Sequence, residues 1–239
     1  MEQKNNILEV ENLSIEYGSI KAVKAVNLTI RQGEFIALIG PNGAGKTSLL
    51  KGILGVQRVR EGHIYFSGKD ITNLATDKIV GAGLCLIPEG HVIFSSMTVL
   101  ENLQLGAYHL DRDYNKSLKR VLDYFPILQE RRHQVAETLS GGERQILSMG
   151  RALMSNPKLI LIDEPSLGLA PKMVADIYNI ISELHQEGYS ILLAEQNAKK
   201  ALTSSNRCYV MKTGEIIMSG YSGDLMQEPK IRQAYFGDA

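Results

Sequence analysis

Residues 35–47 read FIALIGPNGAGKT, a short apolar run that leads straight into a glycine-rich loop. The run predicts a buried strand, and the KTSLLKGIL that follows predicts a helix. Residues 40–47 fit the pattern G-x-x-x-x-G-K-[ST] in the strand–loop–helix context that a phosphate-binding loop requires. Gly43 and Gly45 let the backbone wrap a phosphate chain, and the N–H groups of the loop form a nest for its charge. This stretch therefore predicts an α/β nucleotide-binding core.

The side chains of the loop predict a nucleotide that carries a metal ion. Lys46 is expected to reach the β- and γ-phosphates, and Thr47 to bind Mg²⁺ through its hydroxyl. A glycine-rich turn that binds nothing is the alternative, and it leaves the Lys-Thr pair unexplained. The residues predicted to hold the nucleotide here are Gly40, Pro41, Asn42, Gly43, Ala44, Gly45, Lys46, Thr47 and Ser48.

Residues 159–164, LILIDE, give a second signal for the same chemistry: an apolar strand that ends in two acids. Asp163, at the strand tip, is expected to hold the Mg²⁺ shell. Glu164, one residue further, is expected to polarise the water that attacks the γ-phosphate. Two solvated acids at a strand end would be a plausible reading of this run alone. Together with the glycine-rich loop it predicts a Mg-dependent nucleoside triphosphatase with Lys46 and Glu164 in catalytic roles.

Composition narrows the class of protein. The 239 residues suit one large domain or a domain with an insertion. The 26 basic side chains are balanced by 26 acidic ones, so the sequence lacks the excess positive charge typical of nucleic-acid binding. The apolar runs are too short for a helix that crosses a bilayer, and MEQKNNILEV lacks the apolar core of a signal peptide. Cys85 and Cys208 lie in apolar runs and predict buried free thiols in a reducing compartment. We therefore expect a cytoplasmic protein.

The order of predicted elements describes one domain, residues 1–239, with an insertion. Strand patterns dominate the first third, helical periodicity follows from about residue 97 to 154, and strand, helix and strand return after it. The prediction is a nucleotide-binding α/β core over 1–89 and 157–239, with an all-helical subdomain over 90–156. RCYVMKTGEIIMSG, in the last part of the chain, predicts a hairpin with a Thr-Gly turn.

Residues 139–145, LSGGERQ, look like a second phosphate-binding helix start, with a serine at the cap position and small residues beside it. A serine-capped helix with glycines for close packing is the plainer interpretation. Downstream of a phosphate loop and shortly before LILIDEP, however, LSGGE resembles the signature of ABC-type ATPases, and the resemblance covers essentially the whole chain. It implies a P-loop NTPase fold: a RecA-like core, an N-terminal antiparallel β-subdomain and an inserted helical subdomain.

The resemblance also implies how LSGGERQ works. Two cassettes pair head to tail in this family, and each signature closes over the nucleotide of the other. ATP would then join the dimer and hydrolysis would release it. The loop SLGLAP, 166–171, would cross the dimer interface. The residues implied to bind the partner's nucleotide are Ser140, Gly141, Gly142 and Glu143.

Three further positions take their expected roles from the family. Tyr17 matches the aromatic residue that stacks on adenine, with a core tyrosine as the alternative. Glu89 stands where the family usually has a glutamine that touches Mg²⁺ and senses the transport partner. Gln196 stands where a histidine usually contacts the γ-phosphate. The amide of Gln196 can donate a hydrogen bond to phosphate but carries no charge.

The departures at positions 89 and 196 together give a first prediction. Hydrolysis should survive because Glu164 is present, while its rate and its coupling to the partner should be altered. We expect Gln196→His to change the ATPase rate and its stimulation by a partner, measured by phosphate release. An unchanged rate and an unchanged stimulation would show that this position does not tune turnover.

The combination of IPEGH, SMTVLENL, LSGGERQ, DEPSLGLAP and AEQN narrows the resemblance to the ATPases of branched-chain (hydrophobic) amino acid importers, and to the smaller of their two ATPase subunits. His91 departs from the arginine common there, which leaves urea or an amide open as the solute. The implied partners are membrane permease subunits, a second ATPase that is a paralogue or another copy of this chain, and indirectly a solute-binding protein. The location implied is the inner face of the membrane.

The helical block would carry the surface that docks on the permease. Val92, Ile93, Phe94 and Met97 are the candidates for an apolar contact, and simple packing of the helical insertion is the alternative. An ABC-type mechanoenzyme acting on DNA or ribosomes is a competing function, but the coiled coil or second cassette typical of that class is missing from the sequence. A kinase built on the same loop would leave LSGGERQ unexplained and would need an acceptor lid.

Overall fold

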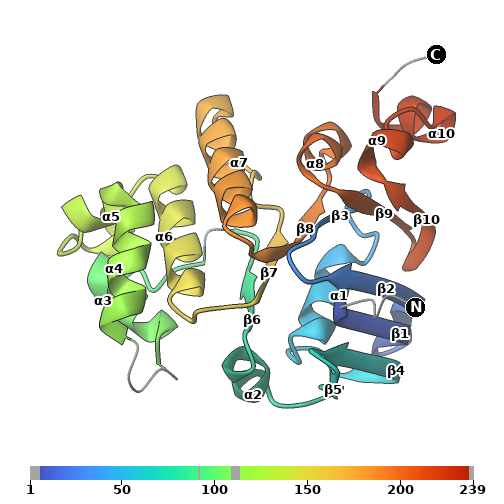
Figure 1. Ribbon diagram of the computed structural model, residues 1–239, viewed down its shortest axis with the longest axis horizontal. Helices are drawn as coiled ribbons and strands as arrows, with labels where there is room; N and C mark the ends of the chain where they lie inside the picture. Colours follow the sequence, from blue (N-terminus) through green and yellow to red (C-terminus); the bar gives the residue numbers. More distant parts are fainter. Residues whose placement is uncertain (1–5, 91, 109–113, 237–239) are drawn as a thin grey trace.

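The computed structural model describes residues 6–90, 92–108 and 114–236. Two sheets lie on one side of the molecule, and a block of helices lies on the other (Figure 1). This arrangement confirms the predicted fold class, an α/β core with an antiparallel sheet at its N-terminal end and helices inserted before the last strands.

The first sheet is antiparallel and has the order β2-β1-β4-β5. Its strands are β1 (Asn6–Tyr17), β2 (Ile20–Arg31), β4 (Val59–Phe66) and β5 (Lys69–Asp70). The sequence pattern suggests two strands, ILEVENL and SIEY, but both belong to β1. The register shifts between Val10 and Leu13, where Asn12 has φ 48°, so a bulge absorbs the break in alternation.

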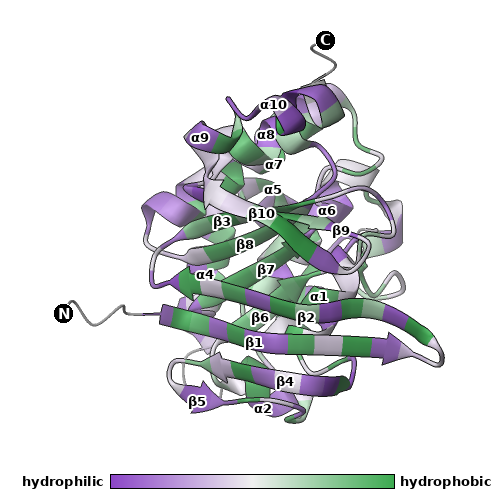
Figure 2. Cartoon of the chain, turned by 90° about the vertical axis from the view of Figure 1, so that its right-hand side faces the viewer, coloured by the Kyte–Doolittle hydropathy of each residue, from purple (hydrophilic) through white to green (hydrophobic). Residues whose placement is uncertain are grey.

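The second sheet is the core that positions the phosphate loop, with the order β10-β9-β3-β8-β7-β6. Its strands are β3 (Phe35–Ile39), β6 (Leu84–Ile87), β7 (Leu159–Asp163), β8 (Ser190–Glu195), β9 (Arg207–Lys212) and β10 (Glu215–Tyr221). All pairs are parallel except β9 with β10. Every residue of β3, β7 and β8 is buried, which explains their unbroken apolar sequences, seen as green ribbon in Figure 2.

The helices fall into two groups. The bounds of the main ones are α1 (Lys46–Ile53), α2 (Thr76–Gly81), α3 (Val99–Gly106), α4 (Tyr114–Tyr124), α5 (Pro126–Glu130), α6 (Gly141–Leu153), α7 (Pro171–Gln186) and α8 (Ala198–Ser204). Short turns follow at α9 (Ser222–Leu225), α10 (Pro229–Ile231) and Arg232–Phe236. Helices α3 to α6 gather away from the sheets (Figure 1). A Cβ at Gly106 would collide with the carbonyl oxygen of Arg151, so α3 and α6 approach backbone to backbone.

Three further expectations can be compared with the structure. Thr213 and Gly214, both with positive φ, form the predicted turn between β9 and β10. Cys85 and Cys208 are buried free thiols, as predicted. No helix of the described ranges is long and apolar enough to cross a membrane.

Candidate functional site

The phosphate loop joins β3 to α1 in a conformation that depends on its glycines. Gly43 has φ 77° and Gly45, at the N-cap of α1, has φ 107°. Any Cβ at Gly45 would meet the carbonyl oxygen of Ala22, and one at Gly40 would meet that of Met211. The first N–H groups of α1 have no partner within the helix, so this loop is a ready anion site.

A cavity of about 440 Å³ opens on this loop. Glu89 and Glu164 line it together with the loop, whose contributing residues are Asn42, Gly43, Ala44, Gly45, Lys46, Thr47 and Ser48. The structure thus brings together nine of the predicted site residues, from three separate parts of the chain. The first two residues of the motif, Gly40 and Pro41, supply carbonyl oxygens to the Lys46 ammonium instead.

Lys46 is almost fully buried and its ammonium group is held by three oxygens. It donates to the carbonyl of Gly40 at 2.8 Å and of Pro41 at 3.2 Å, and it lies 3.0 Å from Oε1 of Glu164. The two residues expected to act on the phosphate and on the water are therefore paired with each other. A triphosphate in the cavity would compete with Glu164 for this charge.

Asp163 ends β7 as a buried carboxyl with an unusual protonation equilibrium. Burial raises its pKa from 3.8 to about 6; the nearby Thr47 hydroxyl and Lys46 oppose this shift, while the charges of Glu89 and Glu164 add to it. Its Oδ1 atom is buried and has no hydrogen-bond partner among the described residues. A buried, unpartnered carboxylate oxygen beside a threonine hydroxyl suits a hard cation.

The fit to Mg²⁺ can be judged from this set of donors. Across the described ranges, no group of three Asp, Glu, His or Cys side chains could hold a metal alone. Mg²⁺ commonly takes one or two carboxylates, with phosphate oxygens and water completing its shell. Thr47 and Asp163, with Glu89 close to them, match that pattern, so the residues present fit Mg²⁺ bound together with a phosphate chain.

Glu164 follows β7 in a strained backbone conformation, with φ 42°, and is 8% exposed. Its amide donates to the carbonyl of Ala194 at 2.9 Å, which ties it to the end of β8. A non-glycine residue at positive φ costs about 1 kcal/mol or more and commonly marks a functional site. The backbone turn directs the carboxylate into the cavity, where it meets Lys46.

Gln196 lies away from the phosphate cavity and lines a second hollow of about 440 Å³ with Glu164, Ser166, Gly168 and Tyr235. Its side chain is exposed. The two hollows share Glu164. Position 196 is thus next to the predicted catalytic carboxylate, although it does not line the loop cavity in this structure.

The LSGGERQ segment begins α6. Ser140 is the N-cap and forms a capping box with Glu143, whose carboxylate is also 2.8 Å from Arg131. Ser140 and Gly141 are exposed, whereas a Cβ at the buried Gly142 would collide with Met173. None of these residues lines the phosphate cavity. Figure 1 shows α6 on the far side of α7 from α1.

Tyr17, at the end of β1, is 41% exposed. The alternative of a core tyrosine is therefore wrong. Tyr17 does not line the phosphate cavity; Ile20, Lys21 and Ala22, which follow the turn after it, do. His91, the departure from the importer pattern, is outside the described residues.

The structure adds site residues that the sequence did not indicate. Thr213 and Gly214 line the phosphate cavity, and the amide of Gly214 donates to the carbonyl of Ala44 at 2.8 Å. Glu195, the residue before Gln196, is buried. The Thr-Gly turn was visible in the sequence, but its position against a loop about 170 residues earlier was not.

Comparison with known proteins gives one consistent family. The family model described as ABC transporter matches residues 23–167. The chain is 43% identical, over 97% of its length and 100% of the relative's, to the high-affinity branched-chain amino acid transport ATP-binding protein BraG of Pseudomonas aeruginosa. It is 34% identical, over 98% of both chains, to the lipopolysaccharide export system ATP-binding protein LptB of Haemophilus influenzae. A crystal structure of an ABC transporter cassette in its ADP conformation matches with a TM-score of 0.86 and 31% identity, covering 98% of this chain and 99% of that one.

Proposed function

The chain belongs to the ATPases of the ABC transporter family, and on that premise we propose that it powers the uptake of branched-chain or other hydrophobic amino acids through a separate membrane permease. The observation that supports ATP hydrolysis is that the phosphate loop, Glu164 and Glu89 line one cavity. The similarity to a branched-chain amino acid relative along the full chain supports the solute. An ATPase for urea or an amide is the second candidate.

The proposed nucleotide is ATP, with its phosphates on the loop amides and on Lys46. Thr47 and Asp163 would hold Mg²⁺, with Glu89 beside them, and the ion would neutralise charge on the phosphates. When the phosphates attract Lys46, Glu164 loses its partner and its carboxylate becomes free to polarise a water. Binding and activation of the base are thus linked through one ammonium group.

We propose that a complete site needs two chains. The exposed Ser140 and Gly141 at the start of α6 are available to a partner and remote from their own phosphate loop, which supports binding in trans. The adenine contact of Tyr17, the γ-phosphate contact of Gln196 and the roles of Gly142 and Glu143 stay predictions within this scheme. The second ATPase would be a paralogue or another copy of this chain.

Docking on the permease is proposed at a hollow of about 370 Å³ beside α3 and α6. Val92 and Phe94 are 51% and 50% exposed, while Ile93 packs against the core and Met97 is half-buried. The guanidinium of Arg151 lies 5.2 Å from the Phe94 ring and fixes it at the rim. An apolar segment of the permease is the proposed occupant.

This docking would hold the protein at the inner, cytoplasmic face of the membrane, and a solute-binding protein would act with it only indirectly. The proposed subdomains are 1–89 with 157–239, which carry the nucleotide, and 90–156, which carries the signature. Both contribute residues to the docking hollow, among them Leu86 from the first and Phe94 from the second. Movement of the 90–156 subdomain relative to the nucleotide-binding core would pass the conformational change caused by ATP hydrolysis on to the permease.

The proposal is tested by uptake in cells that lack the native gene and express this chain. Wild type should restore uptake of labelled leucine, and Phe94→Glu should lower it about tenfold or more, because losing a buried aromatic anchor costs about 2 kcal/mol. Ile217→Glu is the matched control, since Ile217 is also exposed, at 55%, but lies on β10. If wild type restored uptake of urea or acetamide but not of leucine, the proposed solute would be wrong. If Phe94→Glu supported full leucine uptake, the proposed docking site would be wrong.

A further inference from the structure

Glu195 is a buried acidic residue that has no role in the proposed ATP hydrolysis. It ends β8, is 2% exposed, and takes part in none of the ion pairs found across the described residues. Burying an ionised carboxylate without a cation is costly unless several donors satisfy it. A glutamate at this buried position therefore depends on the hydrogen-bond donors around it.

The carboxylate of Glu195 joins two loops that carry predicted site residues. Its Oε1 accepts a hydrogen bond of 2.7 Å from the hydroxyl of Ser166, two residues after Glu164. Its Oε2 accepts from the amides of Gln196 at 3.1 Å and Asn197 at 3.2 Å. Both carboxylate oxygens accept hydrogen bonds, so this one side chain joins the two loops.

The sheet places Glu195 between the two other parts of the site. Strand β8 lies between β3 and β7, with Glu195 opposite Ile39, and the carbonyl of Glu195 accepts from the amide of Gly40 at 3.3 Å. On the other side, the preceding residue Ala194 accepts from the amide of Glu164. One strand end thus touches the phosphate loop, the loop of the predicted base and the turn of Gln196.

We propose that Glu195 is a positioning residue that sets the catalytic Glu164 against the turn of Gln196 by holding Ser166. Glu195 lines the second hollow with Glu164 and Ser166 and does not line the phosphate cavity, so it acts through these neighbours. The assignment rests on the proposed role of Glu164 in hydrolysis. Burial, together with the nearby carboxylate of Glu195, raises the pKa of the Tyr178 phenol on α7.

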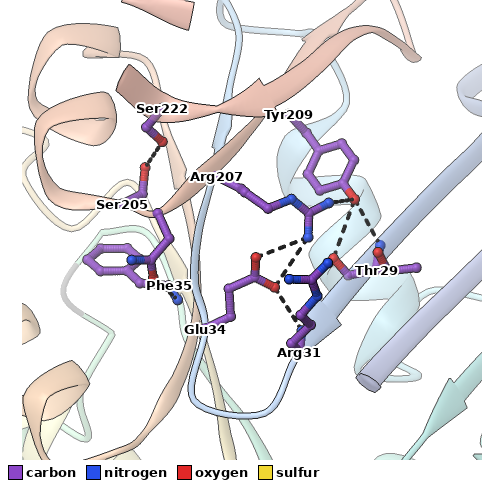
Figure 3. Close-up of polar contacts among 9 residues, drawn as sticks. Thr29, Arg31, Glu34, Phe35, Ser205, Arg207, Tyr209 and Ser222 are labelled. Atoms are coloured by element: carbon purple, nitrogen blue, oxygen red, sulfur yellow. Dashed lines mark hydrogen bonds and ion pairs between the residues drawn. The ribbon is translucent and has the colours of Figure 1, made fainter. Parts of the chain in front are cut away.

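The variants that test this role are Ser166→Ala, Glu195→Gln and the double replacement in the full-length chain. Glu195→Gln keeps the shape but removes the charge and one of the two acceptor oxygens. Glu34→Gln is the matched control, because Glu34 is also a largely buried carboxylate, bonded to Arg207 at 3.0 Å (Figure 3). Glu34 precedes β3, at the opposite end of that strand from the phosphate loop.

The first readout is amide hydrogen exchange of the nucleotide-free chain. The amides of residues 166–170 should exchange about tenfold faster in Ser166→Ala and in Glu195→Gln, the effect of losing one good hydrogen bond, and at the wild-type rate in Glu34→Gln. Wild-type exchange of this segment in both test variants would overturn the proposal. So would equally faster exchange in Glu34→Gln, because that would indicate a general loss of stability.

The second readout is the ATPase rate at saturating Mg-ATP. Each single variant should lose about tenfold in kcat with KM little changed, and the double variant should lose no more than Glu195→Gln, because both act through one hydrogen bond. A loss of about a hundredfold in kcat in the double variant, or a change in KM alone, would contradict the proposed role of Glu195. If wild type itself hydrolyses no ATP, the proposed ATPase function fails, while the exchange data still decide whether Glu195 holds the loop.

Discussion

Glu164→Gln should bind ATP with near wild-type affinity and hydrolyse it about 10²–10⁴ times more slowly, the range that a general base contributes. The carboxylate of Glu164 lies in the cavity, where it can accept a proton from an attacking water, and a strained backbone sets its position. Glutamine has the same shape but a much weaker basic oxygen. Binding of radiolabelled ATP and phosphate release measure the two quantities separately.

The same variant decides how the second half of the site is supplied. Static light scattering with and without Mg-ATP would weigh the stalled protein. A dimer that forms only with ATP would mean that LSGGERQ closes over the phosphate loop of an identical chain. A monomer that still binds ATP would mean that a paralogous ATPase or the permease must complete the pair. Unimpaired hydrolysis by Glu164→Gln, with Glu34→Gln as the control, would remove Glu164 from the catalytic role altogether.

Asp163→Asn should stabilise the nucleotide-free protein at pH 8 while destroying Mg-dependent hydrolysis. The pKa of Asp163 is raised to about 6 in the folded chain from 3.8, so the folded state favours the neutral carboxyl. Below pH 3.8 Asp163 is protonated in both states, and its contribution to the free energy of unfolding is then at its maximum. This contribution is lost as the pH rises through about 6, because the ionised carboxylate is disfavoured in the folded chain. Two pKa units correspond to about 3 kcal/mol, which in a domain of this size is on the order of 6–12 °C in Tm.

Thermal unfolding in EDTA checks this sign. The Tm advantage of Asp163→Asn over wild type should grow between about pH 4 and pH 6 and stay nearly constant above about pH 7. With Mg-ATP the order should reverse, because only the ionised Asp163 can hold the ion. An advantage of equal size at about pH 4 and about pH 8 would show that the pKa of Asp163 is not raised by folding and that the substitution stabilises the protein for another reason.

The sequence by itself determined the parts of this protein that are built from neighbouring residues. FIALIGPNGAGKT specifies a strand, a loop and a helix in succession, and the loop geometry depends on glycines within it. LILIDE likewise specifies a buried strand that ends in Asp163 and Glu164. The cap of α6 lies within SGGE, and the turn of the last hairpin within Thr213 and Gly214. Local hydrogen bonds and backbone preferences fix such units, so their residue patterns are readable.

Only the tertiary structure decided which of these units meet. The order β3-β8-β7 brings Glu195 between the phosphate loop and Glu164, and the fold brings Gly214 against Ala44. The hydrogen bond between Ser166 and Glu195 joins residues 29 positions apart, and no sequence pattern around either residue predicts it. The raised pKa of Asp163 has the same origin, because burial depends on what packs around a strand end. Strand order is set by the packing of the whole chain, and no short pattern in the sequence records it.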